Sequence, residues 1–188
     1  MIRHLHAAVL AVIFAGASVP TPAFAQSTPT VVIIVRHAEK GTTPANDPPL
    51  SEAGMLRAKA LAAALTAANV QAVITTQLVR TRETARPTAE AHGLTMETVQ
   101  VGGAAPEHAN AVADAVRQHV GQTVLVVGHS NTVTQIIAAL GGPKMPDLCD
   151  SQYSNIYTLV LDGTSARLVQ ATFGAPSPEM ATGCPAMK

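Results

Sequence analysis

Hydrophobic residues along this chain fall into two kinds of segment. Residues 31–35 (VVIIV) and 123–127 (TVLVV) are short runs rich in β-branched side chains with no polar alternation. Such runs are typical of strands that are buried on both faces of a sheet. A further short buried strand is predicted over 70–75 and a weak one over 94–101. Longer stretches with caps or Gly and Pro at their ends predict helices over about 52–68, 78–92, 106–119 and 131–140.

The order of these elements predicts the fold class. Strands and helices alternate up to residue 140, and two further strands, 155–161 and 166–172, are joined around Asp162 and Gly163, which is a hairpin signal. This order predicts a three-layer α/β/α fold with a mainly parallel central sheet. No internal repeat or interdomain linker interrupts it, so a single domain is expected.

The first 25 residues have the pattern of an export signal. A short start carrying Arg3 precedes an apolar run over 7–19, and Ala-Phe-Ala at 23–25 has the small-x-small form of a cleavage site. The run is shorter than the roughly 20 residues of a spanning helix, which argues against the alternative of a membrane anchor. We therefore expect cleavage after Ala25, a domain over 26–188 that is secreted or periplasmic, and no membrane contact after cleavage.

Charge and composition narrow the possible partners. The chain has 12 basic and 12 acidic residues, and loss of Arg3 with the signal would leave 11 − 12 = −1. Three aromatic residues would remain, Tyr153, Tyr157 and Phe173. Because neither a basic field nor a stacking surface is present, we expect no nucleic-acid partner.

Two cysteines remain in the predicted mature chain. An even count in an exported protein favours a disulfide between Cys149 and Cys184, which would hold down the Pro- and Gly-rich tail over 175–188. Two free thiols are the alternative. Two cysteines match no metal-ligand spacing, and neither a metal nor a cofactor is expected.

Candidate chemistry lies where the two strongest strands end. Arg36 and His37 end the first, and Gly128-His129-Ser130 follows the second. In α/β folds ligands bind at the carboxyl ends of the strands, and the predicted helix after His129 would add an N-terminus that suits an anion. Arg80 follows the 70–75 strand, and two arginines can hold phosphoryl oxygens with their fixed forks of donors.

Three segments resemble the histidine phosphatase superfamily, which also contains the cofactor-dependent phosphoglycerate mutases. They are Arg36-His37, the stretch 77–85 (QLVRTRETA) and residues 128–130, and the resemblance covers about 31–172. It implies that His37 is a nucleophile that forms a phosphohistidine. It further implies that the phosphoryl group is bound by Arg36, Arg80 and His129, with Ser130 in the same motif. Ala38 departs from the family signature, which usually has Gly there.

The resemblance also implies a general acid between the second arginine and the second histidine. Glu107, in the first turn of a predicted helix, is the first candidate, and Glu97 is the second. Some members of the family lack this acid, which suits substrates with good leaving groups.

Alternative interpretations of the same residues exist. His37 and His129 would be core histidines, or with Glu39 or Asp47 they would bind zinc, although adjacent arginines repel a cation.

The expected function is a metal-independent exported phosphatase that hydrolyses a phosphomonoester or a phosphorylated side chain. A non-catalytic phosphate or phosphosugar binder is the alternative, and a mutase is a third possibility. The remaining histidines of the predicted helices, His92, His108 and His119, are expected at the surface.

The loops predicted to select the substrate are short and polar. They cover 41–49, 102–106 and 141–154, and the first of them is expected to cover one side of the site. Their small polar side chains favour a small phosphorylated substrate or a phosphorylated protein side chain over a large lipid.

Overall fold

The computed structural model describes residues 28–163 and 165–177, and it has one six-stranded sheet with the strand order β3-β2-β4-β1-β5-β6. The first four strands in this order run parallel, whereas β5 and β6 are antiparallel to their neighbours. The strands are β1 (Thr30–Arg36), β2 (Ala72–Thr75), β3 (Met96–Thr98), β4 (Thr123–Gly128), β5 (Asn155–Asp162) and β6 (Ser165–Thr172). The helices are α1 (Glu52–Ala64), α2 (Val79–Ala91), α3 (Ala105–Arg117) and α4 (Val133–Ala139).

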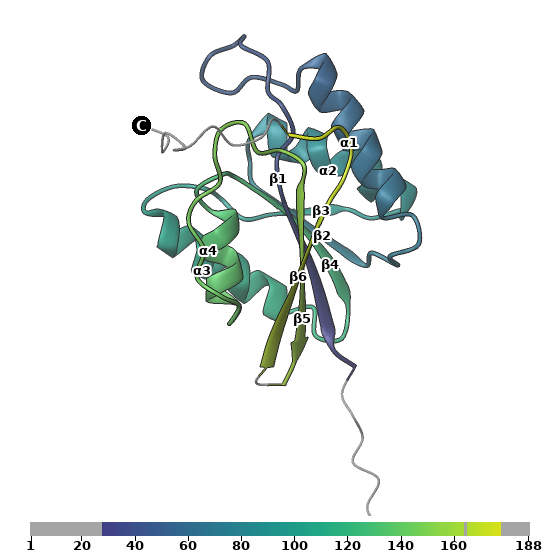
Figure 1. Cartoon of the computed structure of the whole chain (residues 1–188), viewed down its shortest axis with the longest axis vertical. Coiled ribbons are helices and arrows are strands. Elements are labelled where there is room, and N and C mark those ends of the chain that lie inside the picture. Colours follow the sequence, from purple (N-terminus) through teal and green to yellow (C-terminus); the bar gives the residue numbers. More distant parts are fainter. Residues whose placement is uncertain (1–27, 164, 178–188) are drawn as a thin grey trace, which may run out of the picture.

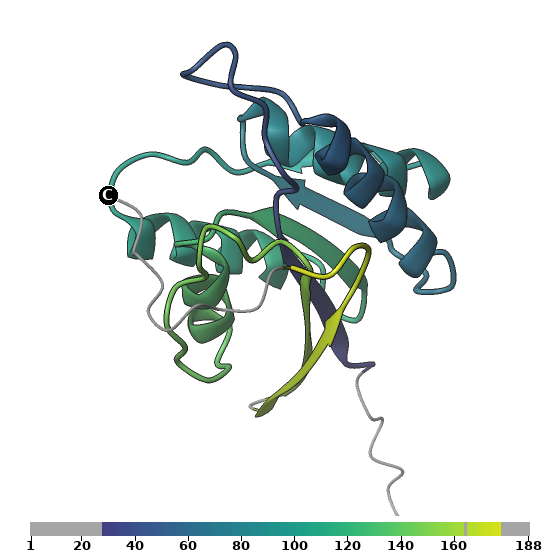
Figure 2. The same cartoon turned by 45° about the horizontal axis from the view of Figure 1, so that its top comes forward.

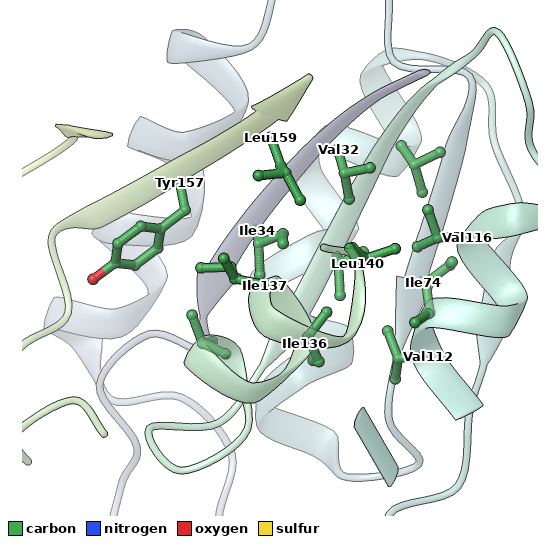
Figure 3. Close-up of a cluster of buried hydrophobic side chains, with 14 of the residues drawn as sticks. Val32, Ile34, Ile74, Val112, Val116, Ile136, Ile137, Leu140, Tyr157 and Leu159 are labelled. Carbon is green, nitrogen blue, oxygen red and sulfur yellow. The ribbon is translucent and has the colours of Figure 1, made fainter. Parts of the chain in front are cut away.

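Two pairs of helices cover the two faces of the sheet (Figure 1, Figure 2). Within β1, Val32 and Ile34 belong to the core cluster that includes α3 and α4, whereas Ile33 and Val35 belong to the cluster that includes α1 and α2. Figure 3 shows the first cluster, in which side chains from the strands meet those of α3 and α4. Successive residues of a strand point to opposite faces, so a continuous apolar run is what a strand between two helical layers requires.

The three-layer arrangement and the mainly parallel sheet confirm the predicted fold class. Each predicted strand and helix is present, and most bounds differ from the predicted ones by a few residues. The fourth helix begins at Val133 rather than near Asn131, because residues 130–132 form a turn and Thr132 is the N-cap residue. This seven-residue helix does not supply the helix N-terminus that the sequence predicted beside His129.

The start of α1 fixes the loop that follows β1. Ser51 caps the helix by accepting a hydrogen bond from the Gly54 N–H, and its own N–H donates to the Glu39 carbonyl at 2.9 Å. A Cβ at Gly54 would collide with that same carbonyl, so only glycine allows this close approach. Because Glu39 lies two residues after His37, the start of α1 anchors the segment that leaves the site.

Two predictions concern residues that the structure does not describe. The signal peptide over 1–25 lies outside the described residues, as does Cys184, so the signal and the Cys149–Cys184 disulfide stay predictions. Cys149 itself is buried in the loop between α4 and β5. No helix of the described part is both long and apolar enough to cross a membrane.

Candidate active site

Strand register brings the two predicted histidines together. Arg36 of β1 is paired with Gly128 of β4, so the next residues, His37 and His129, leave the sheet side by side. The His37 backbone N–H donates to the Gly128 carbonyl at 2.9 Å. The two imidazole rings have centroids 5.3 Å apart at an interplanar angle of 62°.

The hydrogen bonding of His37 determines its tautomer. Its Nδ1 lies 2.8 Å from the Ala38 carbonyl oxygen. Because a carbonyl only accepts, Nδ1 carries the proton, and the lone pair of the neutral ring is on Nε2. Burial lowers the pKa of His37 well below its usual 6.5, and the nearby His129, Arg36 and Arg80 lower it further. At neutral pH the ring is therefore an uncharged nucleophile with Nε2 available.

Ala38 fits where the related signature has glycine. It is fully buried, and its N–H donates to Oγ1 of Thr84 on α2 at 2.9 Å. Among the described residues Asn69 is the one non-glycine with a positive φ, so the backbone at Ala38 needs no glycine. The methyl group packs against Leu50 and Ala58.

His129 is held between β4 and the end of β2. Its Nε2 lies 3.3 Å from Oγ1 of Thr76, the residue directly after β2. Burial lowers the pKa of His129 to about 3, and Arg80, His108 and Arg36 contribute in the same direction. Both histidines are thus held in the neutral form beside two guanidinium groups.

Arg36 is fixed by the loop between α4 and β5. Its Nη1 donates to the Cys149 carbonyl at 2.8 Å and to the Asp150 carbonyl at 3.0 Å, and the Gln152 carbonyl lies at 3.3 Å. The Tyr153 ring lies beneath the guanidinium, with its centroid 4.0 Å from Cζ. The orientation of Arg36 is therefore set by the protein before any ligand binds.

Arg80 is placed by the first turn of α2. Its Nη1 is 3.7 Å from Oδ1 of Asp47. The Val79 N–H donates to the same carboxylate, at 3.0 Å from Oδ1 and 3.2 Å from Oδ2. Asp47 lies in the loop after β1, so this loop caps α2 from outside, since Leu78 at the N-cap position makes no side-chain cap bond. Asp47 belongs to the 41–49 loop, which was predicted to cover one side of the site, and through Asp47 this loop contacts Arg80.

These side chains line one pocket of about 340 Å³. In it, Arg36, His37, Arg80 and His129 meet, and Nε of each arginine is buried without a hydrogen-bond partner. Because both arginines line the pocket, their guanidinium groups supply the charge and the donors that bind the oxygens of a phosphoryl group. A larger cavity of about 490 Å³ lies at the other end of β1, and its lining contains no histidine, so the chemistry belongs to the smaller pocket.

Other predicted site residues lie outside this pocket lining. Ser130 is buried, with its Oγ unpartnered, and it is the next residue, Asn131, that lines the pocket. Glu107 is exposed in the first turn of α3, and Glu97 is exposed on β3 with its carboxylate 3.1 Å from His119 Nε2. Neither carboxylate is among the residues that line the pocket.

The alternative zinc site is not assembled in this part of the chain. The Glu39 carboxylate accepts hydrogen bonds from Arg57 Nε and Nη2 at 2.7–2.9 Å, and that of Asp47 is used at the start of α2. Within residues 28–163 and 165–177, no group of three or more His, Cys, Asp or Glu is arranged to hold a metal ion.

Sequence reasoning missed several residues of the site and its surroundings. Tyr153 and Asp150 line the pocket from the 141–154 loop, which was expected to select the substrate, but neither carries a local motif. His108 was expected at the surface and is buried instead, with Nδ1 3.1 Å from the Gln100 carbonyl. Its place on the inner face of α3, beside Ala109 and Val112, is the periodic signal that would have shown this.

Comparisons with known proteins agree with this geometry. Residues 32–100 match the model of the histidine phosphatase superfamily (branch 1). Comparison with the curated proteins gives no match. Among solved structures, the protein histidine phosphatase SixA with tungstate is 20% identical, with 76% of this chain and 96% of that chain covered and a TM-score of 0.61.

Two further structures show the same fold. A mycobacterial glucosyl-3-phosphoglycerate phosphatase is 16% identical, with 79% and 100% of the two chains covered and a TM-score of 0.59. Phosphoserine phosphatase from Entamoeba histolytica, in complex with 3-phosphoglyceric acid, is 16% identical, with 78% and 98% covered and a TM-score of 0.55. Residues 32–100 are therefore similar in sequence to the histidine phosphatase superfamily, and the described part of the chain has the same fold as these three phosphatase structures.

Proposed function

We propose that this protein is an exported, metal-independent phosphatase that hydrolyses a phosphomonoester or a phosphorylated side chain through a phosphohistidine on His37. One observation carries the proposal. A neutral histidine with its lone pair on Nε2 shares a small pocket with the guanidinium groups of two arginines. A site that only bound phosphate would need the arginines but not a nucleophile in this tautomer.

The proposed reaction has two displacements. His37 Nε2 attacks phosphorus, so that a P–N bond forms while the P–O bond to the leaving group breaks. Water then attacks the phosphohistidine, which releases inorganic phosphate and restores the neutral ring. Arg36, Arg80 and His129 hold the phosphoryl oxygens, and because the first is already fixed by three carbonyls, little reorganisation is needed during transfer.

Hydrolysis of p-nitrophenyl phosphate tests this function. The purified protein is assayed from pH 4 to 8 with a chelator present, beside His37→Ala and the control His119→Ala, whose histidine pairs with Glu97 outside the pocket. We expect chelator-resistant turnover in the wild type and the control, and none in His37→Ala. Turnover that persists in His37→Ala would refute the role of His37.

Binding without turnover is the competing function. If the wild type hydrolyses no phosphate ester but binds phosphate in calorimetry, and Arg80→Ala abolishes that binding, the protein is a phosphate or phosphosugar binder. The structural neighbours support hydrolysis, since they include a glucosyl-3-phosphoglycerate phosphatase and a phosphoserine phosphatase.

Export is the second part of the proposal. It is supported by the charge, the apolar run and the Ala-Phe-Ala pattern of the first 25 residues. Expression of the full chain in a Gram-negative host, followed by fractionation and mass spectrometry, is expected to recover from the periplasm a product that begins at Gln26. A full-length product confined to the cytoplasm would overturn it.

A further inference from the structure

The two carboxylates that the sequence offered as general acid lie outside the pocket lining, so the proton for the leaving group needs another source. When an alkyl phosphate is cleaved, the departing oxygen is strongly basic, and a positioned acid typically accelerates its loss by about 10²–10⁴-fold. Glu107 and Glu97 are both exposed on α3 and β3. Among the described residues that line the pocket with His37 and Arg36, Asp150 carries the one carboxyl group.

Asp150 is fixed close to the phosphate-binding part of the site. Its Oδ1 lies 3.5 Å from Arg36 Nη2, and its backbone carbonyl accepts a hydrogen bond from Nη1 of the same guanidinium at 3.0 Å. Two contacts to one arginine set both the backbone and the carboxyl group of Asp150 relative to Arg36. If Arg36 binds a phosphoryl oxygen, the same guanidinium group contacts both that oxygen and the Asp150 carboxyl group.

His37 and Asp150 differ strongly in their exposure to solvent. His37 is 4% exposed, whereas the Asp150 side chain is 58% exposed. In an in-line displacement the leaving group departs on the side opposite the nucleophile, which is here the open side of the pocket. Because the Asp150 side chain lines the pocket and is more than half exposed, it is available to a leaving group on the solvent side.

We propose that Asp150 is the general acid of this enzyme, on the loop before β5 rather than at either position predicted from the sequence. This inference rests on the proposed phosphatase function. The Asp150 carboxyl proton passes to the ester oxygen as the P–O bond breaks and the P–Nε2 bond to His37 forms. In the second step the Asp150 carboxylate takes a proton from the attacking water, which restores the acid and completes the cycle.

A comparison of two leaving groups in Asp150→Asn tests this role. Asparagine keeps an oxygen that accepts a hydrogen bond from Arg36 Nη2, but it has no proton to transfer. We expect kcat/KM for glycerol phosphate to fall by about 10²-fold or more, and that for p-nitrophenyl phosphate, whose leaving group needs little protonation, to fall by less than about 10-fold. Asp150→Glu, which restores a carboxyl group, is expected to recover part of the glycerol phosphate activity.

Three variants serve as comparisons. Asp147 lies on the same loop outside the pocket, with its Oδ1 3.4 Å from Thr134 Oγ1. Asp147→Asn and Glu107→Gln are both expected to match the wild type on both substrates. Tyr153→Phe tests the Tyr153 hydroxyl group as an alternative proton donor; its oxygen accepts a hydrogen bond from Arg36 Nη2 at 3.3 Å. We expect any loss in Tyr153→Phe to be equal for the two substrates.

Several results would overturn the assignment. An equal loss on both substrates in Asp150→Asn would make Asp150 a positioning residue for Arg36, and no loss would remove it from the reaction. A loss selective for glycerol phosphate in Tyr153→Phe or Glu107→Gln would assign the acid elsewhere. A wild type that hydrolyses neither ester would instead defeat the phosphatase function itself, so the two failures are distinguishable.

Discussion

The buried neutral His129 is expected to make folding stability fall in acid, and His129→Gln isolates that effect. Its folded-state pKa is about 3, against 6.5 for an unperturbed histidine. As the pH falls below 6.5, the unfolded chain takes up a proton at this position while the folded protein does not, so protonation favours unfolding. Between the unfolded pKa of 6.5 and pH 5 there are roughly 1.5 pH units, so protonation of the unfolded chain lowers the unfolding free energy by about 2 kcal/mol at pH 5.

Glutamine is a suitable replacement because its amide keeps a donor for Thr76 Oγ1 and has no titratable proton. Urea unfolding of wild type and His129→Gln at pH 7.5 and pH 5, in phosphate-free buffer, gives the unfolding free energy of each. The variant is expected to gain about 2 kcal/mol relative to the wild type between the two pH values. Ser130→Ala, a neighbouring buried residue without a titratable group, should differ from the wild type by the same amount at both. If His129→Gln and the wild type lose stability in parallel, His129 is not held neutral by its surroundings.

Two further predictions concern His37 and its anchoring. Because burial holds the pKa of His37 well below 6.5, the nucleophile stays neutral as the pH falls through that value, so phosphoryl transfer from p-nitrophenyl phosphate should persist at pH 5; an activity that titrates away with a midpoint near 6.5 in single-turnover measurements would contradict this. Arg57 is buried, binds the Glu39 carboxylate through Nε and Nη2, and donates from Nη1 to the Phe173 and Ala175 carbonyls. Arg57→Met is therefore expected to cost about 3 kcal/mol in urea unfolding, compared with less than about 0.5 kcal/mol for the exposed Arg82→Met; equal effects of the two would show that the Glu39 pair contributes nothing.

Much of the fold could be predicted from the sequence because the strongest patterns, such as the apolar runs of the strands, involve residues adjacent in the chain. The apolar run of β1 has to be buried on both faces, and the structure places it between α1–α2 and α3–α4. The two histidines could be brought together from sequence because each directly follows a strong strand, and adjacent parallel strands end at the same edge. Ser51 was a predictable cap, since its position before Glu52 is a standard helix start.

The residues that were missed depend on contacts distant in sequence. Asp47 orients Arg80 and caps α2 across more than thirty positions, and Arg57 joins Glu39 to the end of β6. Asp150 and Tyr153 reach Arg36 because the loop after α4 turns back toward β1, with Leu148 N–H bonded to the Ser130 carbonyl at 2.9 Å. No sequence spacing predicts that this loop turns back toward β1. The residues that it contributes to the pocket could therefore be found only in the three-dimensional structure. The helix start near Asn131 was placed two residues too early because residues 130–132 form a turn before α4.

The central claim is that His37 becomes covalently phosphorylated, and trapping the intermediate tests it most directly. Wild-type protein is mixed with excess p-nitrophenyl phosphate, quenched within milliseconds in alkali, where phosphohistidine survives, and digested for mass spectrometry. We expect a phosphate on the peptide that contains His37, absent in His37→Ala and unstable to acid. Phosphate on another residue, or steady turnover by His37→Ala without any adduct, would contradict the account.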